Sequence, residues 1–249
     1  MGDTSQFDQV DDFCDALACI LKPPVAGNLR KLRYYTQRYG LLHGLCSLLG
    51  RRSTRFWGLV GPIVTRGYLR RWLASSGPHV VNLGGGNVLS DRWLAADVDP
   101  RSDIFVDITR PLPFPNASLD VVYSEETIEH VDEYQGQTML RECFRILRPG
   151  GTLRITTPSF DYLSSQALQD VQKVRQLNAI FYEHGHRFIY TEHALLSALK
   201  DTGFSGILKS TYRDPKSKYG VFDSHPARFP HAAPEWSQYW EADKPPAVA

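Results

Sequence analysis

The stretch from residue 80 to residue 158 constrains the fold more than any other part of the chain. Short apolar runs typical of buried strands alternate in it with polar loops and one helical pattern, and three consecutive glycines follow the first run. Strands that alternate with helices predict a parallel sheet with helices on its faces. We therefore expect an α/β fold with a doubly wound, mostly parallel sheet of seven strands.

The predicted elements divide the chain into a helical part and a sheet. Strands are expected at residues 80–83, 93–97, 103–106, 119–124, 152–156, 207–212 and 236–242, the last at the sheet edge. Helices are expected at residues 11–21, 28–49, 67–74, 132–147 and 191–202, the last with Thr191 as its N-cap and Gly203 as its end. A chain of 249 residues can bury one substantial core. We expect one main domain over residues 76–249 and an N-terminal helical cap over residues 1–75.

Chemically informative residues follow the first three strands. Ligands on such sheets bind at the carboxyl ends of the strands. Glycines 84–86 let the backbone turn sharply there, and Asp97 and Asp107 come at the end of the second strand and just after the third. A dinucleotide site would need a glycine where Leu89 stands and an acid about 20 residues after the turn, whereas Asp97 follows Gly84 by 13. The spacing therefore disfavours a dinucleotide.

Three phrases carry a family resemblance. They are NLGGGN after the first strand, WLAAD at the second, and LRECFRILRPGGTLRITTP as a helix, turn and strand. With them, residues 80–160 resemble the class I S-adenosylmethionine-dependent methyltransferases, in the branch of methyltransferase type 11. The resemblance implies the Rossmann-like methyltransferase fold, with S-adenosylmethionine as cofactor.

The resemblance also implies roles for individual residues. Asp97 matches the acid that accepts hydrogen bonds from both ribose hydroxyls, a task suited to a carboxylate. Asp107 matches the acid that meets the adenine amino group, with Ile108 beside the ring. The turn at Gly84 and Gly86 would surround the methionine part. The expected cofactor-binding residues are Asn82, Leu83, Gly84, Gly85, Gly86, Asp97, Val98, Asp107, Ile108, Ser124 and Glu125.

Two features depart from the family pattern. Only residues 87–92 separate the glycines from the second strand, so a turn replaces the usual first helix. The methionine carboxylate then lacks the usual helix N-terminus nearby. Glu126 stands where relatives commonly carry a histidine, which either removes a catalytic imidazole or reflects a different acceptor.

Methyl transfer to a hydroxyl needs alignment and a general base. The candidate bases are His130, which could instead be a helix-packing residue, and His184 and His186 in the segment 159–190, which we expect to be an insertion on the acceptor side. The H-x-H pattern can indicate a metal, but no third ligand at a useful spacing is evident, so we expect none.

The sequence is compatible with three functions. The first is a methyltransferase that acts on O, N or C of a small molecule, such as a secondary metabolite or a sugar-containing compound. The second is an enzyme of the same fold that uses the cofactor without moving a methyl group, as a cyclase would. The third is a non-catalytic binding protein.

Charge and composition bear on partners and location. Eleven of the 28 Lys and Arg residues and none of the 27 Asp and Glu residues lie between residues 16 and 90. This basic stretch could pack on the acidic main domain, or could meet an anionic acceptor, a carrier protein or a membrane surface. We expect no nucleic-acid partner, because no known motif accompanies the charge. With no signal peptide, no transmembrane segment and no metal-type cysteine spacing, we expect a cytoplasmic protein, and a homodimer is compatible with the sequence.

Overall fold

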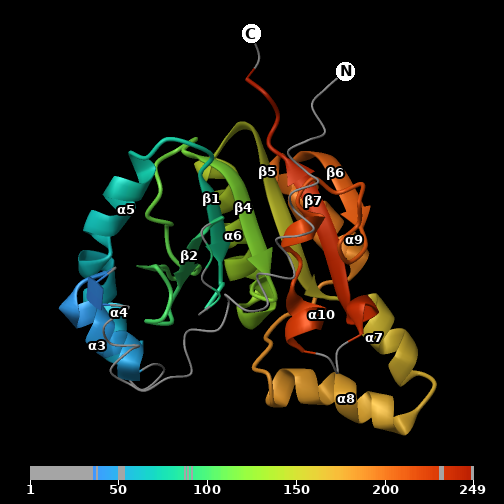
Figure 1. Ribbon diagram of the computed structural model, residues 1–249. Coiled ribbons are helices and arrows are strands. Elements are labelled where there is room, and N and C mark those ends of the chain that lie inside the picture. Colours follow the sequence, from blue (N-terminus) through green and yellow to red (C-terminus); the bar gives the residue numbers. More distant parts are fainter. Residues whose placement is uncertain are drawn as a thin grey trace.

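The sheet forms the centre of the protein (Figure 1). The computed structural model describes residues 36–37, 39–49, 54–86, 88, 90, 92–229 and 233–247, so the helix expected at residues 11–21 lies outside the described part. The strands run in the order β3-β2-β1-β4-β5-β7-β6. Their bounds are Val80–Leu83 for β1, Leu94–Asp97 for β2, Ile104–Phe105 for β3, Leu119–Glu125 for β4, Leu147–Pro158 for β5, Ser205–Ser210 for β6 and Ser237–Asp243 for β7. The expected seven-stranded α/β sheet is confirmed.

One strand occupies a different position from the one expected. Strands β1 to β5 pair in parallel, and β7 runs antiparallel between β5 and β6. The prediction that the last strand lies at the sheet edge was therefore wrong, because β6 takes that edge. Burial explains the order: β7 is buried along nearly its whole length, whereas β6 is largely exposed.

Helices cover the sheet and extend beyond one end of it. Their bounds are Leu41–Leu49 for α3, Thr54–Val64 for α4, Arg66–Leu73 for α5, Glu133–Ile146 for α6, Phe160–Ala167 for α7, Val171–Tyr182 for α8, Glu192–Thr202 for α9 and His225–Arg228 for α10. Helices α4 and α5 contact β3, and α6 packs against α9. In Figure 1, α7, α8 and α10 lie toward the end at which β4 and β5 point. Within the described ranges, none of the helices combines the length and apolar composition needed to cross a membrane.

Local sequence explains where the main helices begin and end. Asp132 caps α6 in a reciprocal capping box with Gln135. Thr191 accepts a hydrogen bond from the Ala194 amide at the start of α9, and Gly203 ends that helix in the left-handed conformation at φ +105°, as predicted. The helix expected at residues 28–49 is interrupted at Gly40, which has a φ of +96°, and α3 starts only at Leu41.

The core lies between the sheet and its covering helices. It joins apolar residues of β1, β2, β4 and β5 to the inner faces of α6 and α9, and it includes Leu69 of α5. Helix α5 contributes to the same core as the sheet. The division into a cap and a main domain at residue 75 remains a prediction. This core fixes the carboxyl ends of β1, β2 and β4 beside one another, which is where the candidate site lies.

Candidate active site

A cavity of about 650 Å³ opens at the carboxyl ends of β1, β2 and β3. Its wall contains most of the residues that the sequence indicated for a cofactor, together with one of the indicated histidines. They are Gly84, Gly85, Gly86, Asp97, Val98, Asp107, Ile108 and His130. Residues that are distant in sequence therefore line one hollow at the expected edge of the sheet.

The glycine turn is attached directly to the acid of the next strand. The Gly86 amide donates to Oδ2 of Asp97 at 2.8 Å, and Gly84 donates to the Ala96 carbonyl at 2.9 Å. Gly84 has a φ of +75°, and a Cβ on it would lie 2.0 Å from Oγ1 of Thr127. Only glycine fits this position, since any side chain would meet both backbone strain and a clash.

Asp97 keeps acceptor capacity toward the cavity. Its Oδ1 accepts from the Asp99 amide at 2.8 Å and its Oδ2 from Gly86. Burial raises the pKa of this carboxyl above its ordinary value, although these amide hydrogen bonds oppose the shift. Each carboxylate oxygen has a second lone pair, so the pair of oxygens can still accept from two hydroxyls of a ligand.

Asp107 lies across the same cavity at the start of the loop after β3. Its Oδ1 accepts from the amide of Thr109 at 3.0 Å and from its hydroxyl at 2.7 Å, and Arg110 lies 3.2 Å from Oδ2. The residue thus holds the proline-rich turn, and it also borders the cavity beside Ile108. These two roles are compatible, because the carboxylate is only partly covered.

The remaining indicated residues do not line this first cavity, although Glu125 lines a second one. Asn82, Leu83 and Ser124 are buried in β1 and β4. Glu125 is buried at the end of β4, and its carboxylate accepts from the Ser224 amide and hydroxyl, the His225 amide and the Arg228 guanidinium, all within 2.6–2.9 Å.

Glu125 therefore has a clear structural role. Burial raises its pKa, but the Arg228 charge and the hydrogen bonds from Ser224 and His225 outweigh burial and lower the pKa below its ordinary value. The ionised carboxylate holds α10 so that Arg228 and Phe229 border the cavity.

A second cavity, of about 560 Å³, adjoins the first and shares Gly84, Glu126 and His130 with it. All three histidines that the sequence indicated line this second cavity, and His225, which the sequence did not indicate, joins them. Apolar side chains from α7, α8 and the segment before β7 complete the wall: Leu163, Ile180 and Trp236. The segment 159–190 therefore supplies part of the wall, as an acceptor-side insertion would.

Glu126 lies where the two cavities meet. It adopts a φ of +53°, which is unusual for a residue with a side chain and is typical of functional sites. The Ser237 hydroxyl donates to its Oε1 at 2.8 Å. Burial, and then the neighbouring Glu129, raise its pKa well above the ordinary value.

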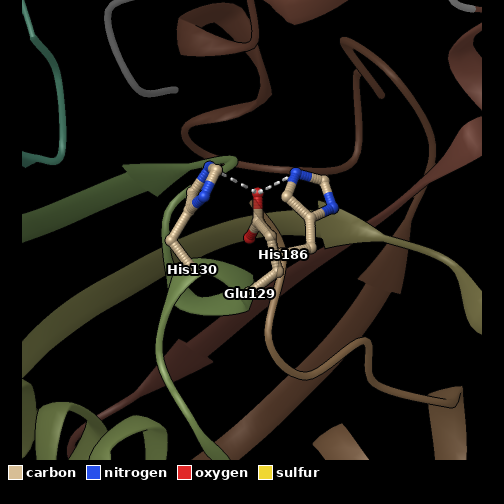
Figure 2. Close-up of side chains that lie close together, drawn as sticks. All are labelled: Glu129, His130 and His186. Carbon is tan, nitrogen blue, oxygen red and sulfur yellow. Dashed lines mark ion pairs between the residues drawn. The ribbon is translucent and has the colours of Figure 1, made fainter. Parts of the chain in front are cut away.

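Glu129, His130 and His186 converge beside the second cavity (Figure 2). Oε1 of Glu129 lies 3.9 Å from Nε2 of His130 and 4.0 Å from Nε2 of His186. Burial raises the pKa of Glu129 to about 7 and lowers that of His186 to about 3, and burial also lowers the pKa of His130. At neutral pH both imidazoles are therefore neutral and can accept a proton or donate a lone pair.

The comparison with protein families agrees with this geometry. Residues 65–155 match the sequence model of a family described as a methyltransferase domain. The match includes β1 to β4, the glycine turn, Asp97 and Asp107. Over this part, the chain is similar to S-adenosylmethionine-dependent methyltransferases.

Two curated proteins match this chain over a short segment. A probable S-adenosylmethionine-dependent methyltransferase of Mycolicibacterium smegmatis is 46% identical over 61 residues, which are 24% of this chain and 23% of that protein. The 27-O-demethylrifamycin SV methyltransferase of Amycolatopsis mediterranei is 38% identical over 66 residues, 26% of this chain and 24% of that protein. The matched part thus spans about a quarter of the length of either relative.

Solved methyltransferase structures cover more of the chain than the curated relatives do, but at lower sequence identity. A Haloferax volcanii methyltransferase in complex with the activator Trm112 gives a TM-score of 0.49 at 17% identity, covering 79% of this chain and 96% of that one. A Thermotoga maritima S-adenosylmethionine-dependent methyltransferase gives 0.46 at 17% identity, covering 76% and 99%.

The sequence did not single out several residues of the candidate site. Glu129, Thr127, Arg228 and His225 border or support the cavities, and none was indicated. Glu129 could have been found, because it stands directly before the indicated His130 in the turn that follows a predicted strand. No pattern in the sequence indicated that Arg228 would reach Glu125.

Proposed function

We propose that this protein is an S-adenosylmethionine-dependent methyltransferase that acts on a hydroxyl group of a small molecule. The observation that carries the proposal is the pair of adjoining cavities, with the glycine turn and two carboxylates around one and three histidines around the other. The first cavity would hold the cofactor, and the second would hold the acceptor.

The geometry supports a division of tasks among residues. Asp97 would accept from the ribose hydroxyls, Asp107 would face the adenine amino group, and Ile108 would pack on the ring. The turn at Gly84 and Gly86 would lie along the methionine part. Gly84, Glu126 and His130 border both cavities, so the methyl group would cross from sulfur to acceptor beside them.

The reaction would be an in-line displacement that needs mainly alignment. The acceptor oxygen attacks the methyl carbon, the carbon–sulfur bond breaks, and S-adenosylhomocysteine leaves as a neutral thioether. The hydroxyl proton would pass to His130 or His186, both kept neutral by burial, or to Glu129. His184 lines the same cavity and would contact the acceptor.

Features of the second cavity support a hydroxyl on a partly apolar acceptor. Leu163, Ile180 and Trp236 would cover an apolar body, and His225 would approach an anionic group or a carrier-linked phosphate. The relative from Amycolatopsis mediterranei is named for O-methylation of a rifamycin. A cytoplasmic location fits the buried free thiol of Cys143, and the homodimer expected from the sequence remains a prediction.

Asp97→Ala tests the cofactor assignment. Loss of charge-assisted hydrogen bonds to the ribose, worth about 1.5–3 kcal/mol, should weaken S-adenosylmethionine binding roughly 10- to 100-fold in calorimetric titration. Asp201→Ala, at an exposed position of α9, is the matched control and should bind as the wild type does. Equal affinity of Asp97→Ala, with an unchanged melting temperature, would refute the assignment.

Mass spectrometry of the product tests the reaction itself. Incubation with candidate hydroxyl compounds should give a product heavier by one methyl group, together with S-adenosylhomocysteine. A product without the added methyl group would instead favour the cyclase-type use of the cofactor.

A further inference from the structure

The fold assembles a set of metal-ligand donors that are separated in sequence. Glu129 and His130 belong to the short helical turn Ile128–His130 after β4, and His186 comes from the loop after α8. One donor atom from each, the Glu129 carboxylate and the two imidazoles, lies within 4.8 Å of the others. Figure 2 shows both rings directed at the same carboxylate oxygen.

The central carboxylate oxygen lacks the contact that its burial demands. The Glu129 side chain is fully buried, and Oε1 has no hydrogen-bond partner among the residues that the structure describes. Separations of 3.9 and 4.0 Å to the two Nε2 atoms are too long for hydrogen bonds. They are within reach of two metal–ligand bonds of about 2.0–2.2 Å each.

Surrounding contacts hold the three side chains in place. The Thr157 hydroxyl donates to Oε2 of Glu129 at 2.9 Å, and the rings of His130 and His186 pack edge to face with their centroids 4.7 Å apart. The amides of Arg187 and Phe188 both donate to the Glu129 carbonyl, at 2.7 and 3.2 Å. The loop that carries His186 is therefore held by hydrogen bonds to Glu129 itself. In metal sites, hydrogen bonds from surrounding groups commonly orient the ligands in this way.

We propose that Glu129, His130 and His186 bind one divalent transition-metal ion. Two imidazoles and one carboxylate suit Zn²⁺, Mn²⁺ or Fe²⁺, whereas Mg²⁺ prefers a set of oxygens. The sequence expectation of no metal rested on the lack of a third ligand near the H-x-H pattern. That ligand is supplied from residues 129 and 130, more than fifty residues earlier in the chain.

The role of the ion in the reaction rests on the proposed methyltransferase function. Three protein ligands leave coordination positions open, and His130 and His186 line the acceptor cavity. An acceptor hydroxyl bound to the ion loses its proton more readily. With the ion bound, Glu129, His130 and His186 would hold it and would not take the proton, so the O–H bond would break with its proton passing to solvent. The oxygen would then form a bond to the methyl carbon as the C–S bond breaks to give the neutral thioether. No electron is gained or lost in this step.

Metal binding by the full chain tests the site without any assay of activity. The protein is stripped with a chelator and titrated calorimetrically with Zn²⁺, Mn²⁺ and Mg²⁺, and Co²⁺ is followed by its visible absorption. We expect one Zn²⁺ or Mn²⁺ per chain, no comparable Mg²⁺ binding, and a melting temperature that rises with the ion.

Variants assign that binding to the three residues. Glu129→Gln and His186→Gln should weaken Zn²⁺ binding more than about 100-fold, beyond what loss of a supporting residue causes. His130→Gln should also weaken Zn²⁺ binding. Because His130 is the most exposed of the three side chains, this variant should disturb folding the least. His193→Gln, at an exposed position of α9, should bind as the wild type does.

Each outcome has a defined meaning. No binding by the wild type, or equal binding by the ligand variants, overturns the metal site. If the wild type binds S-adenosylmethionine but no transition metal, the metal site fails and the methyltransferase proposal stands. If it binds one Zn²⁺ or Mn²⁺ through these residues but no S-adenosylmethionine, the metal site stands and the proposed function fails.

Discussion

At the scale of single residues, the site depends on backbone positions that few side chains can occupy. Gly84 combines a positive φ with a close approach to Thr127, and Glu126 takes a positive φ although it carries a side chain. Strain of this kind persists only when the surrounding structure maintains it. Here the surrounding structure is the carboxyl end of β1 and the turn that follows β4, which pack directly against each other.

Gly84→Ala tests how much the close approach to Thr127 matters. The added Cβ would lie 2.0 Å from Oγ1 of Thr127, so the turn must shift away from the cofactor position. We expect a loss of stability of about 1–3 kcal/mol and weaker S-adenosylmethionine binding, measured by urea unfolding and titration.

Gly150→Ala is the matched control for that change. Gly150 has a similar φ of +79° but no atom within 4 Å of its would-be Cβ. The control should therefore lose only the stability due to φ strain and should bind the cofactor normally. Equal effects of the two variants would mean that backbone strain alone, and not the clash, fixes the glycine at position 84.

At the scale of elements, local sequence predicted all seven strands and the ends of the two capped helices, but it missed several other helices. The capping residues of α6 and α9 mark their own boundaries, because a cap acts through hydrogen bonds within one turn. Strand β6 was expected two residues too late, and α7, α8 and α10 were not predicted. Helices α7 and α8 contribute only to a small apolar cluster with Leu163 and Ile180, and α10 has only four residues.

Helix α3 is attached to the sheet mainly through polar contacts with the segment between β2 and β3. The Tyr39 hydroxyl donates to Asp103, and the Ser47 hydroxyl donates to the Pro100 carbonyl. Nε2 of His43 lies 3.0 Å from the Pro100 carbonyl and 3.1 Å from that of Ser102. Burial lowers the pKa of His43 to about 4, although these two hydrogen bonds oppose the shift.

The His43 pKa predicts a pH dependence of stability. The unfolded chain takes up a proton on this residue below about pH 6.5, but the folded protein does so only below about pH 4. The contribution is complete above pH 6.5 and is lost as the pH falls. Between pH 7 and pH 5 we expect His43 to account for a loss on the order of 1–2 kcal/mol.

His43→Gln isolates this contribution from those of the other buried histidines. The amide can still donate to the two carbonyls but does not titrate, so urea unfolding should depend less on pH between pH 7 and pH 5 than in the wild type. His193→Gln should leave the slope unchanged. An unaltered slope in His43→Gln would show that this residue is accessible to protons in the folded state.

At the scale of the whole molecule, distant segments are joined by buried charged groups. Glu125 reaches residues 224–228, about a hundred positions later, and Arg154 in β5 binds Asp223. Nε and Nη2 of Arg154 donate to the two Asp223 oxygens at 3.0 and 2.5 Å, and both side chains are fully buried. These two pairs place residues 211–229 against the sheet and so bring Arg228 to the cavities.

Asp223→Asn tests the fully buried ion pair between Arg154 and Asp223. Loss of one partner leaves the Arg154 charge buried without its counterion, which is expected to lower the free energy of unfolding by about 3–5 kcal/mol. Urea unfolding measures the change, and Asp201→Asn on the surface of α9 is the control. A loss below 1 kcal/mol would mean that Arg154 finds another partner or reaches solvent.

The sequence by itself determined the fold class and the cofactor edge of this protein. The signals for both are local: periodic apolar runs define strands, glycines permit the turn, and acids at strand ends fall at a common edge because parallel strands end together. The sequence did not determine the order of the strands across the sheet. Strand β7 lies between β5 and β6 because burial on both of its faces is favourable there, and no pattern in its own residues indicates that position.

Only the tertiary structure brought Glu129 and His130 to His186, Glu125 to Arg228, and Arg154 to Asp223. These contacts join segments separated by more than fifty residues. Sequence spacing carries no information about such contacts, because the distance between two side chains depends on how the intervening elements pack. The candidate metal and acceptor residues lie among these contacts, so the chemistry of the acceptor side was decided by packing and that of the cofactor side by local sequence.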